Sequence, residues 1–257
     1  MIALIGFCLQ PVSSVFGNDK QKWTEYKGTH FIIYYQNAPK DFVESVESSA
    51  ENYYQEIARN LGFARYKGWT WDERAKIYIY DDQESYVAAA KFYSWSHGGA
   101  SPKNREIHTF PAAHGFFDST LPHELGHIIF REFVGFKAEV PLWFEEGVAM
   151  YQEKAKRWGA NAMVKKALAD GTFIPLDELT RMRLSSKTPP EIVNLYYAEA
   201  ASVVYYLITQ QGESRFVNFC RKLQEGKPFT WTLASVYIRF KNIDALNKAW
   251  MDYLKNE

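Results

Sequence analysis

Cysteine is scarce in this sequence of 257 residues, which contains only Cys8 and Cys220. Two cysteines cannot build the dense disulfide framework of a small secreted scaffold, so stability must come from packing. The hydrophobic content of 47% over this length is ample for a sizeable core. An excess of either charge is also absent, because 30 Lys and Arg balance 30 Asp and Glu. This balance argues against nucleic acid or an anionic membrane surface as a partner.

Charge is absent altogether from the first sixteen residues, which are mostly apolar. This run is too short to span a membrane comfortably as a mature helix. It ends near Val15 and Gly17, two residues small enough for the −3 and −1 positions of a signal-peptidase site. We therefore predict a signal peptide over residues 1–17, export to the periplasm or the exterior, and no stable membrane span in the mature chain. An uncleaved N-terminal anchor is the alternative.

Residues 18–139 show an alternation of strand and helix patterns and no internal repeat. Alternating or β-rich runs predict strands, and spacing of apolar residues by three or four predicts helices. Strands are expected at 30–35, 75–80 and 106–110, helices at 41–61 and 81–92, and a loop at 94–105. The strand at 106–110 is expected at the edge of a cleft, where an extended substrate could pair with it.

Residues 140–257 read as helices with a poorly patterned connection at 171–190. Helices are expected at 143–156, 161–169, 191–211, 213–225 and 242–256. The predicted fold class is therefore α+β, with an N-terminal mixed α/β lobe over a small sheet and a mostly helical C-terminal lobe. The two lobes would form one domain over residues 18–257.

The most informative stretch is His123-Glu124-Leu125-Gly126-His127, within an apolar, helix-like run. Two histidines four residues apart lie one turn apart on one helix face, where both imidazoles can bind one Zn²⁺. Glu124 is then placed to act as general base toward a water on the metal. Asp118, Ser119 and Thr120 offer cap residues before the helix, and Pro122 suits its first turn.

Zinc hydrolases with such a helix need a third protein ligand, and Glu146 is the candidate, nineteen positions after His127. This interval allows one helix to end, a loop to turn and a second helix to return alongside the first. By itself, an acid here is better explained as a first-turn residue that interacts favourably with the helix dipole. The pair of histidines upstream favours the ligand assignment.

The motif followed by W-x-x-E-G-x-A, from Trp143 to Ala149, resembles the gluzincin metallopeptidases, and within them the Peptidase MA-like group. The resemblance implies a zincin, thermolysin-like fold and assigns the third ligand to the Glu directly before Gly. That residue is Glu146, and Glu145 then has neither role. The third metzincin histidine would fall at Phe133, and the thermolysin-type second-shell Asp would fall at Met150, so neither pattern is present.

The function predicted from this resemblance is a zinc-dependent metallopeptidase acting on peptide or protein. Glu124 would activate the zinc-bound water and pass its proton to the leaving amine. Two alternatives remain open: an exported binding or chaperone-like protein that keeps the zinc scaffold, and a zinc hydrolase of a non-peptide amide or ester. No G-x-M-E-N segment precedes the zinc helix, so aminopeptidase specificity is not supported.

A tyrosine often stabilises the oxyanion in such enzymes. The segment Tyr197-Ala198-Glu199-Ala200 resembles the Tyr-Ala-Gln-Ala segment of Peptidase MA-like proteins, with Glu199 in place of Gln. The resemblance makes Tyr197 the candidate oxyanion donor, and the adjacent Tyr196 is the alternative. The oligomeric state stays open.

Overall fold

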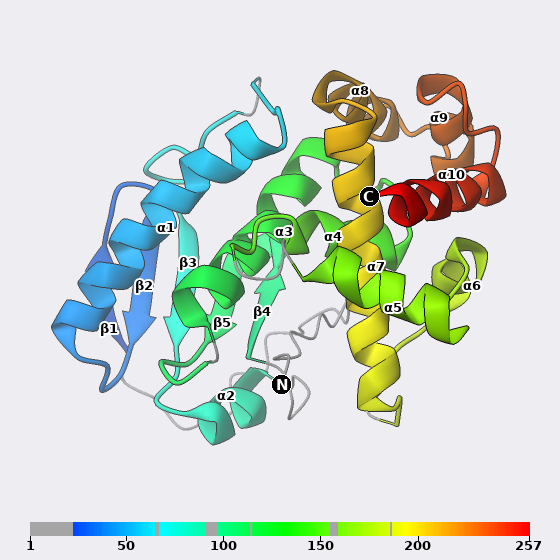
Figure 1. The fold of residues 1–257 in the computed structure, drawn as a ribbon. Coiled ribbons are helices and arrows are strands. Elements are labelled where there is room, and N and C mark those ends of the chain that lie inside the picture. The colour runs from blue at the N-terminus through cyan, green and yellow to red at the C-terminus, as the bar shows by residue number, and fades with distance from the viewer. Residues whose placement is uncertain (1–22, 65–66, 91–96, 114, 155–158, 186) are drawn as a thin grey trace.

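The protein has a mixed α+β architecture, with a small sheet in its N-terminal part and a mostly helical C-terminal part (Figure 1). The computed structural model describes residues 23–64, 67–90, 97–113, 115–154, 159–185 and 187–257. The predicted signal segment, residues 1–17, lies outside these ranges. In the described part, no helix combines the length and the apolar character needed to cross a membrane.

A five-stranded sheet forms the N-terminal part, with strand order β1-β2-β3-β5-β4. The strands β2, β3 and β5 run parallel, and β1 and β4 run antiparallel to their neighbours at the two edges. The strands are β1 Thr24–Lys27, β2 Phe31–Tyr35, β3 Ala75–Ile79, β4 Gly98–Ser101 and β5 Glu106–Thr109.

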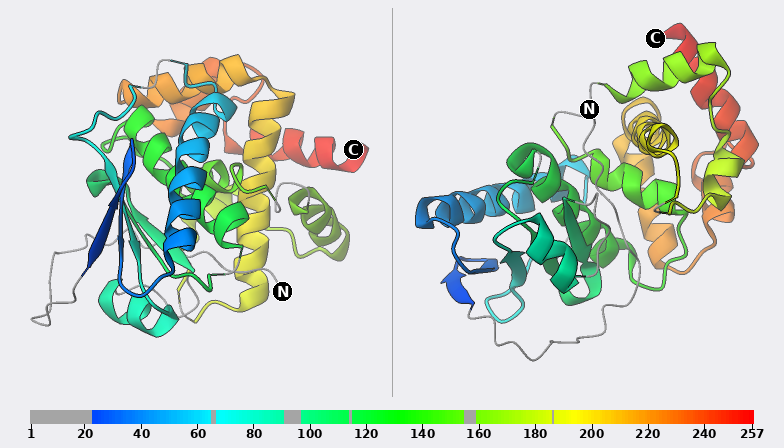
Figure 2. Two further views of the ribbon diagram at one scale, coloured as in Figure 1. Left: turned by 90° about the vertical axis from the view of Figure 1, so that its left-hand side faces the viewer. Right: turned by 90° about the horizontal axis from the view of Figure 1, so that it is seen from below.

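One face of the sheet is the core of this part. Ile33, Ile77 and Ile107 are aligned across the three parallel strands and are fully buried. The helices α1 (Lys40–Asn60) and α3 (Leu121–Val134) pack on one another, and α1 contacts β2 while α3 contacts β4. The alternation of apolar residues therefore turns one face of the sheet toward α1 and α3. On this face, α3 lies over the β4 edge (Figure 2).

The opposite face carries a row of stacked rings across the same three strands. Tyr34 stacks on Tyr78 with centroids 4.9 Å apart, and Tyr78 stacks on His108 at 4.8 Å. The hydroxyl of Tyr80 lies 3.1 Å from Nδ1 of His108. Burial lowers the pKa of His108 to about 4. His108 is therefore a neutral packing residue of the sheet face opposite α3.

The C-terminal part is organised around α7, which packs against both α4 and α5 (Figure 1). The approach of α4 to α7 depends on Gly147, because a Cβ there would lie 2.2 Å from the carbonyl oxygen of Ala200. The helices are α4 Leu142–Met150, α5 Ala160–Asp170, α6 Leu176–Arg181, α7 Pro190–Tyr205, α8 Glu213–Gln224, α9 Phe229–Val236 and α10 Ile243–Asn256.

Two predictions about the sheet were wrong. The strand expected at a cleft edge, β5, is an inner strand, because β4 pairs along its far side. The segment expected as a loop contains β4 and the short 3-10 helix η1 (Pro102–Asn104). The strand β1 precedes β2 as a separate strand, and α2 (Gln83–Ala90) follows β3 as expected.

In the helical part, the predicted connection at 171–190 contains α6, and α9 was not predicted. The helix expected to continue to residue 156 ends at Met150, while residues 155–158 lie outside the described part. The long helix expected at 191–211 is α7 continued by a π-helical turn, η4 (Tyr206–Gln210).

Candidate metal centre

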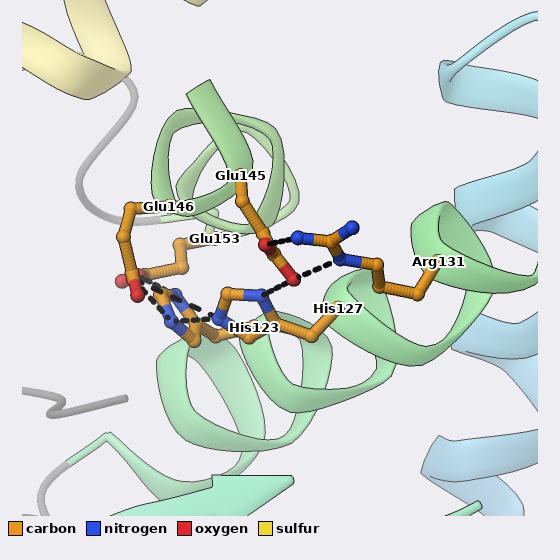
Figure 3. Close-up of polar contacts among 6 residues, drawn as sticks. All are labelled: His123, His127, Arg131, Glu145, Glu146 and Glu153. Carbon is orange, nitrogen blue, oxygen red and sulfur yellow. Dashed lines mark hydrogen bonds and ion pairs between the residues drawn. The ribbon is translucent and has the colours of Figure 1, made fainter. Parts of the chain in front are cut away.

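The helix α3 presents His123 and His127 on a fully buried face (Figure 3). Pro122 lies in its first turn, as predicted, where a missing N–H breaks no intrahelical hydrogen bond. The expected side-chain cap is absent, because a π-helical turn, η2 (Phe116–Thr120), runs directly into α3 and keeps Thr120 helical. The four-residue spacing then brings the two imidazoles together, with their Nε2 atoms 3.1 Å apart.

The third residue of the cluster, Glu146, comes from α4. Its Oε2 lies 3.5 Å from Nε2 of His123 and 3.7 Å from Nε2 of His127. All three side chains are at most 1% exposed. The two helices therefore bring together the three residues that sequence spacing predicted, and these form a cluster that could hold a metal ion.

The separations of these atoms fit a tetrahedral ion. Donor atoms about 2.0–2.1 Å from a tetrahedral zinc lie roughly 3.3 Å from one another. The observed separations of 3.1, 3.5 and 3.7 Å lie around this value. Both carboxylate oxygens of Glu146 are buried without a hydrogen-bond partner in the described part of the chain. Such groups are rare in folded proteins, and a bound cation would satisfy them.

Glu124 lies beside the cluster and is 1% exposed. Neither of its oxygens has a hydrogen-bond partner among the described residues. Burial, with the nearby carboxylates of Glu146 and Glu153, raises the pKa of Glu124 to about 8, although the charge of His123 opposes the shift. A cation bound at the cluster would favour the ionised form, which is the form required of a general base.

The electrostatics of the two histidines differ. Burial lowers the pKa of His123, but its contacts with Glu146 and Glu153 and the charge of Glu124 outweigh this and raise it to about 10. Burial, His123 and Arg131 lower the pKa of His127 well below its usual value. Burial also raises the pKa of Glu146. The carboxylates around His123 therefore favour positive charge at this position, as a bound metal cation would supply.

Glu153 was missed by the sequence reasoning. It lies just after α4, is fully buried, and its Oε1 is 2.8 Å from Nδ1 of His123 (Figure 3). Its other oxygen accepts a hydrogen bond from the hydroxyl of Ser119. No spacing rule used for the sequence points to a residue seven positions after Glu146 and beyond the end of its helix.

Glu145, which was expected to be neither ligand nor base, is held by Arg131. The guanidinium of Arg131 donates to both carboxylate oxygens, with the Nε–Oε1 bond at 2.8 Å. Oε1 also lies 3.8 Å from Nδ1 of His127, on the side of the ring away from Glu146 (Figure 3). In the sequence, this ion pair was indicated by Arg131, a basic residue four positions after His127.

Tyr196 and Tyr197 both lie buried on α7. The hydroxyl of Tyr196 has no hydrogen-bond partner in the described residues. Burial raises its pKa, and the charge of Glu146 raises it further, which places Tyr196 within electrostatic range of the cluster. Tyr197 packs against it with ring centroids 5.7 Å apart.

Comparison with known families agrees with this geometry. A family model described as Peptidase MA superfamily matches residues 59–256, which include α3, α4 and α7. No curated protein matches the sequence.

Proposed function

The chain belongs to the Peptidase MA superfamily, and we propose that it is a zinc-dependent metallopeptidase that hydrolyses peptide bonds. The observation that carries the proposal is the convergence of His123, His127 and Glu146, from two helices, beside the buried acid Glu124. The superfamily match supports a peptidase fold, and the donor set of two imidazoles and one carboxylate is one that zinc uses in hydrolases.

The residues of the site divide into ligands and a base. His123, His127 and Glu146 would hold the ion, and when bound it would polarise the carbonyl and lower the pKa of an attacking water. Glu124 accepts a proton from that water at one carboxylate oxygen and delivers it to the leaving amine nitrogen. The burial of Glu124 keeps bulk water away from this proton, which supports direct transfer.

An extended peptide is the substrate class that this site favours. β4 is the last strand of the sheet in the described chain and packs on α3. A Cβ on Gly98 would lie 2.6 Å from Cγ2 of Thr120 and 3.3 Å from Oε1 of Glu124. A substrate strand added to β4 would therefore run beside the base. This role passes from β5, where it was expected, to β4.

Tyr197 is our proposed oxyanion donor, on the resemblance of its segment to the Tyr-Ala-Gln-Ala segment of the group. Its place on α7, which packs directly against α4, supports the assignment. We also propose that the protein is exported, on the apolar segment at residues 1–17.

The test combines metal analysis with hydrolysis. Purified protein is assayed for zinc and for cleavage of casein, and of acylated and amidated small substrates, with and without a chelator. Zinc at one equivalent and chelator-sensitive cleavage of casein are expected. Cleavage of the small substrates alone would instead indicate a non-peptide hydrolase, and zinc binding without any turnover would indicate a binding protein.

Two variants test the mechanism. Glu124→Gln should retain zinc and lose about 10²- to 10⁴-fold in kcat, because the amide cannot accept the proton. His123→Ala should lose both zinc and activity. Full peptidase activity in metal-loaded Glu124→Gln protein would overturn the proposed mechanism.

A further inference from the structure

We propose that Arg183 is a specificity-determining residue, which binds a carboxylate of the peptide substrate beside the metal centre. The inference rests on the proposed peptidase function and names its substrate class, peptides with a carboxylate near the cleaved bond. The carboxylate belongs either to an Asp or Glu side chain or to the C-terminus of the peptide. A guanidinium suits both, because its fork of N–H donors matches two carboxylate oxygens.

The first argument is that α6 is attached to α4 beside Glu146. The indole N–H of Trp143 on α4 donates to the hydroxyl of Thr180 on α6 at 2.9 Å. Trp143 precedes Glu146 by three positions, so the two side chains are neighbours on the surface of α4. At the other end of α6, the N–H of Leu176 donates to Oδ1 of Asn247 on α10 at 3.1 Å. The helix is thus held at both ends, and its C-terminal end lies at α4.

The second argument is the position of the Arg183 side chain. Arg183 lies two residues beyond the end of α6, and its guanidinium is folded back on the helix. Nη1 donates to the carbonyl of Met182 at 2.9 Å and to the carbonyl of Thr180 at 3.4 Å. Because Thr180 also accepts the hydrogen bond from Trp143, the guanidinium lies close to the first turn of α4.

Tyr196 on α7 supports this position independently. Burial raises the pKa of its hydroxyl, the charge of Glu146 raises it further, and the charge of Arg183 opposes the shift. The hydroxyl of Tyr196 is therefore within electrostatic range of both Glu146 and Arg183. An extended peptide spans about 3.3 Å per residue, so a substrate needs only a few residues to reach from the cluster to Arg183.

The third argument is that the charge of Arg183 is not compensated within the described part of the chain. The side chain is exposed, forms no ion pair with a described carboxylate, and leaves Nε and Nη2 without a hydrogen bond to a described residue. Arg181, in the same segment, instead forms an ion pair with Asp177 at 2.7 Å. An uncompensated cation beside a binding site raises the local concentration of anionic ligands.

The experiment measures kcat/KM of the zinc-loaded protein on a matched set of synthetic peptides. The parent peptide copies a site that the protein cleaves in casein, with each acid replaced by its amide and the C-terminus amidated. One series places a Glu at each position near the cleaved bond in turn. A second series ends in a free carboxylate at successive lengths beyond the bond. The wild type should prefer the carboxylate about tenfold at its best position in at least one series, which identifies the source.

Three variants at one position separate recognition from structure. Arg183→Gln should lose the preference and keep kcat/KM for the neutral parent within about twofold, because that peptide does not use the guanidinium. Arg183→Lys should keep part of the preference, since the charge remains without the fork of donors. Arg183→Glu should reverse it, so that an anionic peptide is cleaved less well than the neutral parent. A purely structural role for Arg183 would not produce this reversal.

The matched control is Arg181→Gln, which removes an exposed arginine that already has a carboxylate partner. It should keep the wild-type preference. Fluorescence anisotropy gives a readout without turnover: in zinc-loaded Glu124→Gln protein, the same peptides should show the same preference in Kd, and the added Arg183→Gln change should abolish it. The preference should decrease as salt is added, because Arg183 is exposed.

An equal preference in the wild type and Arg183→Gln, or an equal loss in Arg181→Gln, would overturn the inference. Equal cleavage of every peptide by the wild type would also overturn it, while the proposed function would stand. Absence of cleavage of casein and of every peptide is a distinct result, because it would overturn the proposed function and this inference together.

Discussion

Arg131 binds Glu145 through both carboxylate oxygens, and this pair separates the roles of two adjacent glutamates. Glu145 lies on the Nδ1 side of His127, and Glu146 lies on the Nε2 side. Arg131 also donates to the carbonyl of Ala138, 2.9 Å away, in the connection between α3 and α4. One guanidinium thus fixes the connection and holds the carboxylate of Glu145 on the side of His127 away from Nε2.

The first prediction concerns this buried pair. Arg131→Met should destabilise the protein by about 3–5 kcal/mol, because it leaves the carboxylate of Glu145 buried without its counter-charge. The double variant Arg131→Met/Glu145→Gln should recover much of that loss, since no buried charge remains. Denaturant unfolding in the presence of chelator measures both variants without a contribution from metal. A loss below about 1 kcal/mol in the single variant would contradict the role assigned to the pair.

The second prediction concerns the contact between α4 and α7. Gly147→Ala would place a Cβ 2.2 Å from the carbonyl oxygen of Ala200 and 2.5 Å from Cγ2 of Val204, so the two helices must separate. We expect a loss of about 1–3 kcal/mol or more in the free energy of unfolding. Zinc affinity should fall as well, because the adjacent Glu146 moves with its helix.

Gly159→Ala is the control for this change. Gly159 precedes α5 with a right-handed helical conformation, and an added Cβ would meet no heavy atom within 4 Å. Its stability should change little. Equal free energies of unfolding for Gly147→Ala and Gly159→Ala would show that the close approach of Gly147 to the carbonyl of Ala200 does not limit stability.

The third prediction concerns pH and Glu199, which is fully buried on α7. Oε1 accepts the N–H of Ile174 at 2.9 Å, and Oε2 is buried without a partner in the described chain. Burial raises the pKa of Glu199 to about 8, with a contribution from Glu178 and against the hydrogen bond from Ile174. The folded state therefore favours the protonated acid, and ionisation costs stability.

The sign follows from the raised pKa. The unfolded chain loses its proton near pH 4.5, so stability falls as pH rises from there to about 8 and is level above that value. Glu199→Gln mimics the neutral acid and should be more stable than the wild type at pH 8, with the difference vanishing near pH 4. Thermal unfolding from pH 4 to 9 measures this. Glu191→Gln, at an exposed position of α7, controls for the change in net charge.

The cluster of His123, His127 and Glu146 could be predicted from the sequence because it depends on two local patterns. The spacing of His123 and His127 follows from one helical turn, and Glu146 is marked by its motif. The strand β4 could not be predicted in this way, since Gly98-Gly99-Ala100-Ser101 has neither alternation nor β-branched residues. Its strand conformation comes from pairing with β5, which is a long-range contact.

The residues that contact the two histidines show the same limit of prediction from local sequence. Glu153 contacts His123 from thirty positions away, and only the arrangement of α3 and α4 brings them together. Local sequence patterns predict the residues of the cluster, whereas tertiary packing determines which other residues contact them.

The last prediction distinguishes the two tyrosines of α7. Tyr197→Phe should lower kcat about 10²- to 10³-fold with little effect on KM, because the hydroxyl would act on the developing oxyanion. Tyr196→Phe removes a buried hydroxyl that has no hydrogen-bond partner in the described residues, so it should retain kcat and gain about 1 kcal/mol of stability. Steady-state kinetics and denaturant unfolding of both variants provide the comparison. The reverse result, with kcat lost in Tyr196→Phe and retained in Tyr197→Phe, would assign the donor to Tyr196, whose electrostatic coupling to Glu146 already places it near the cluster.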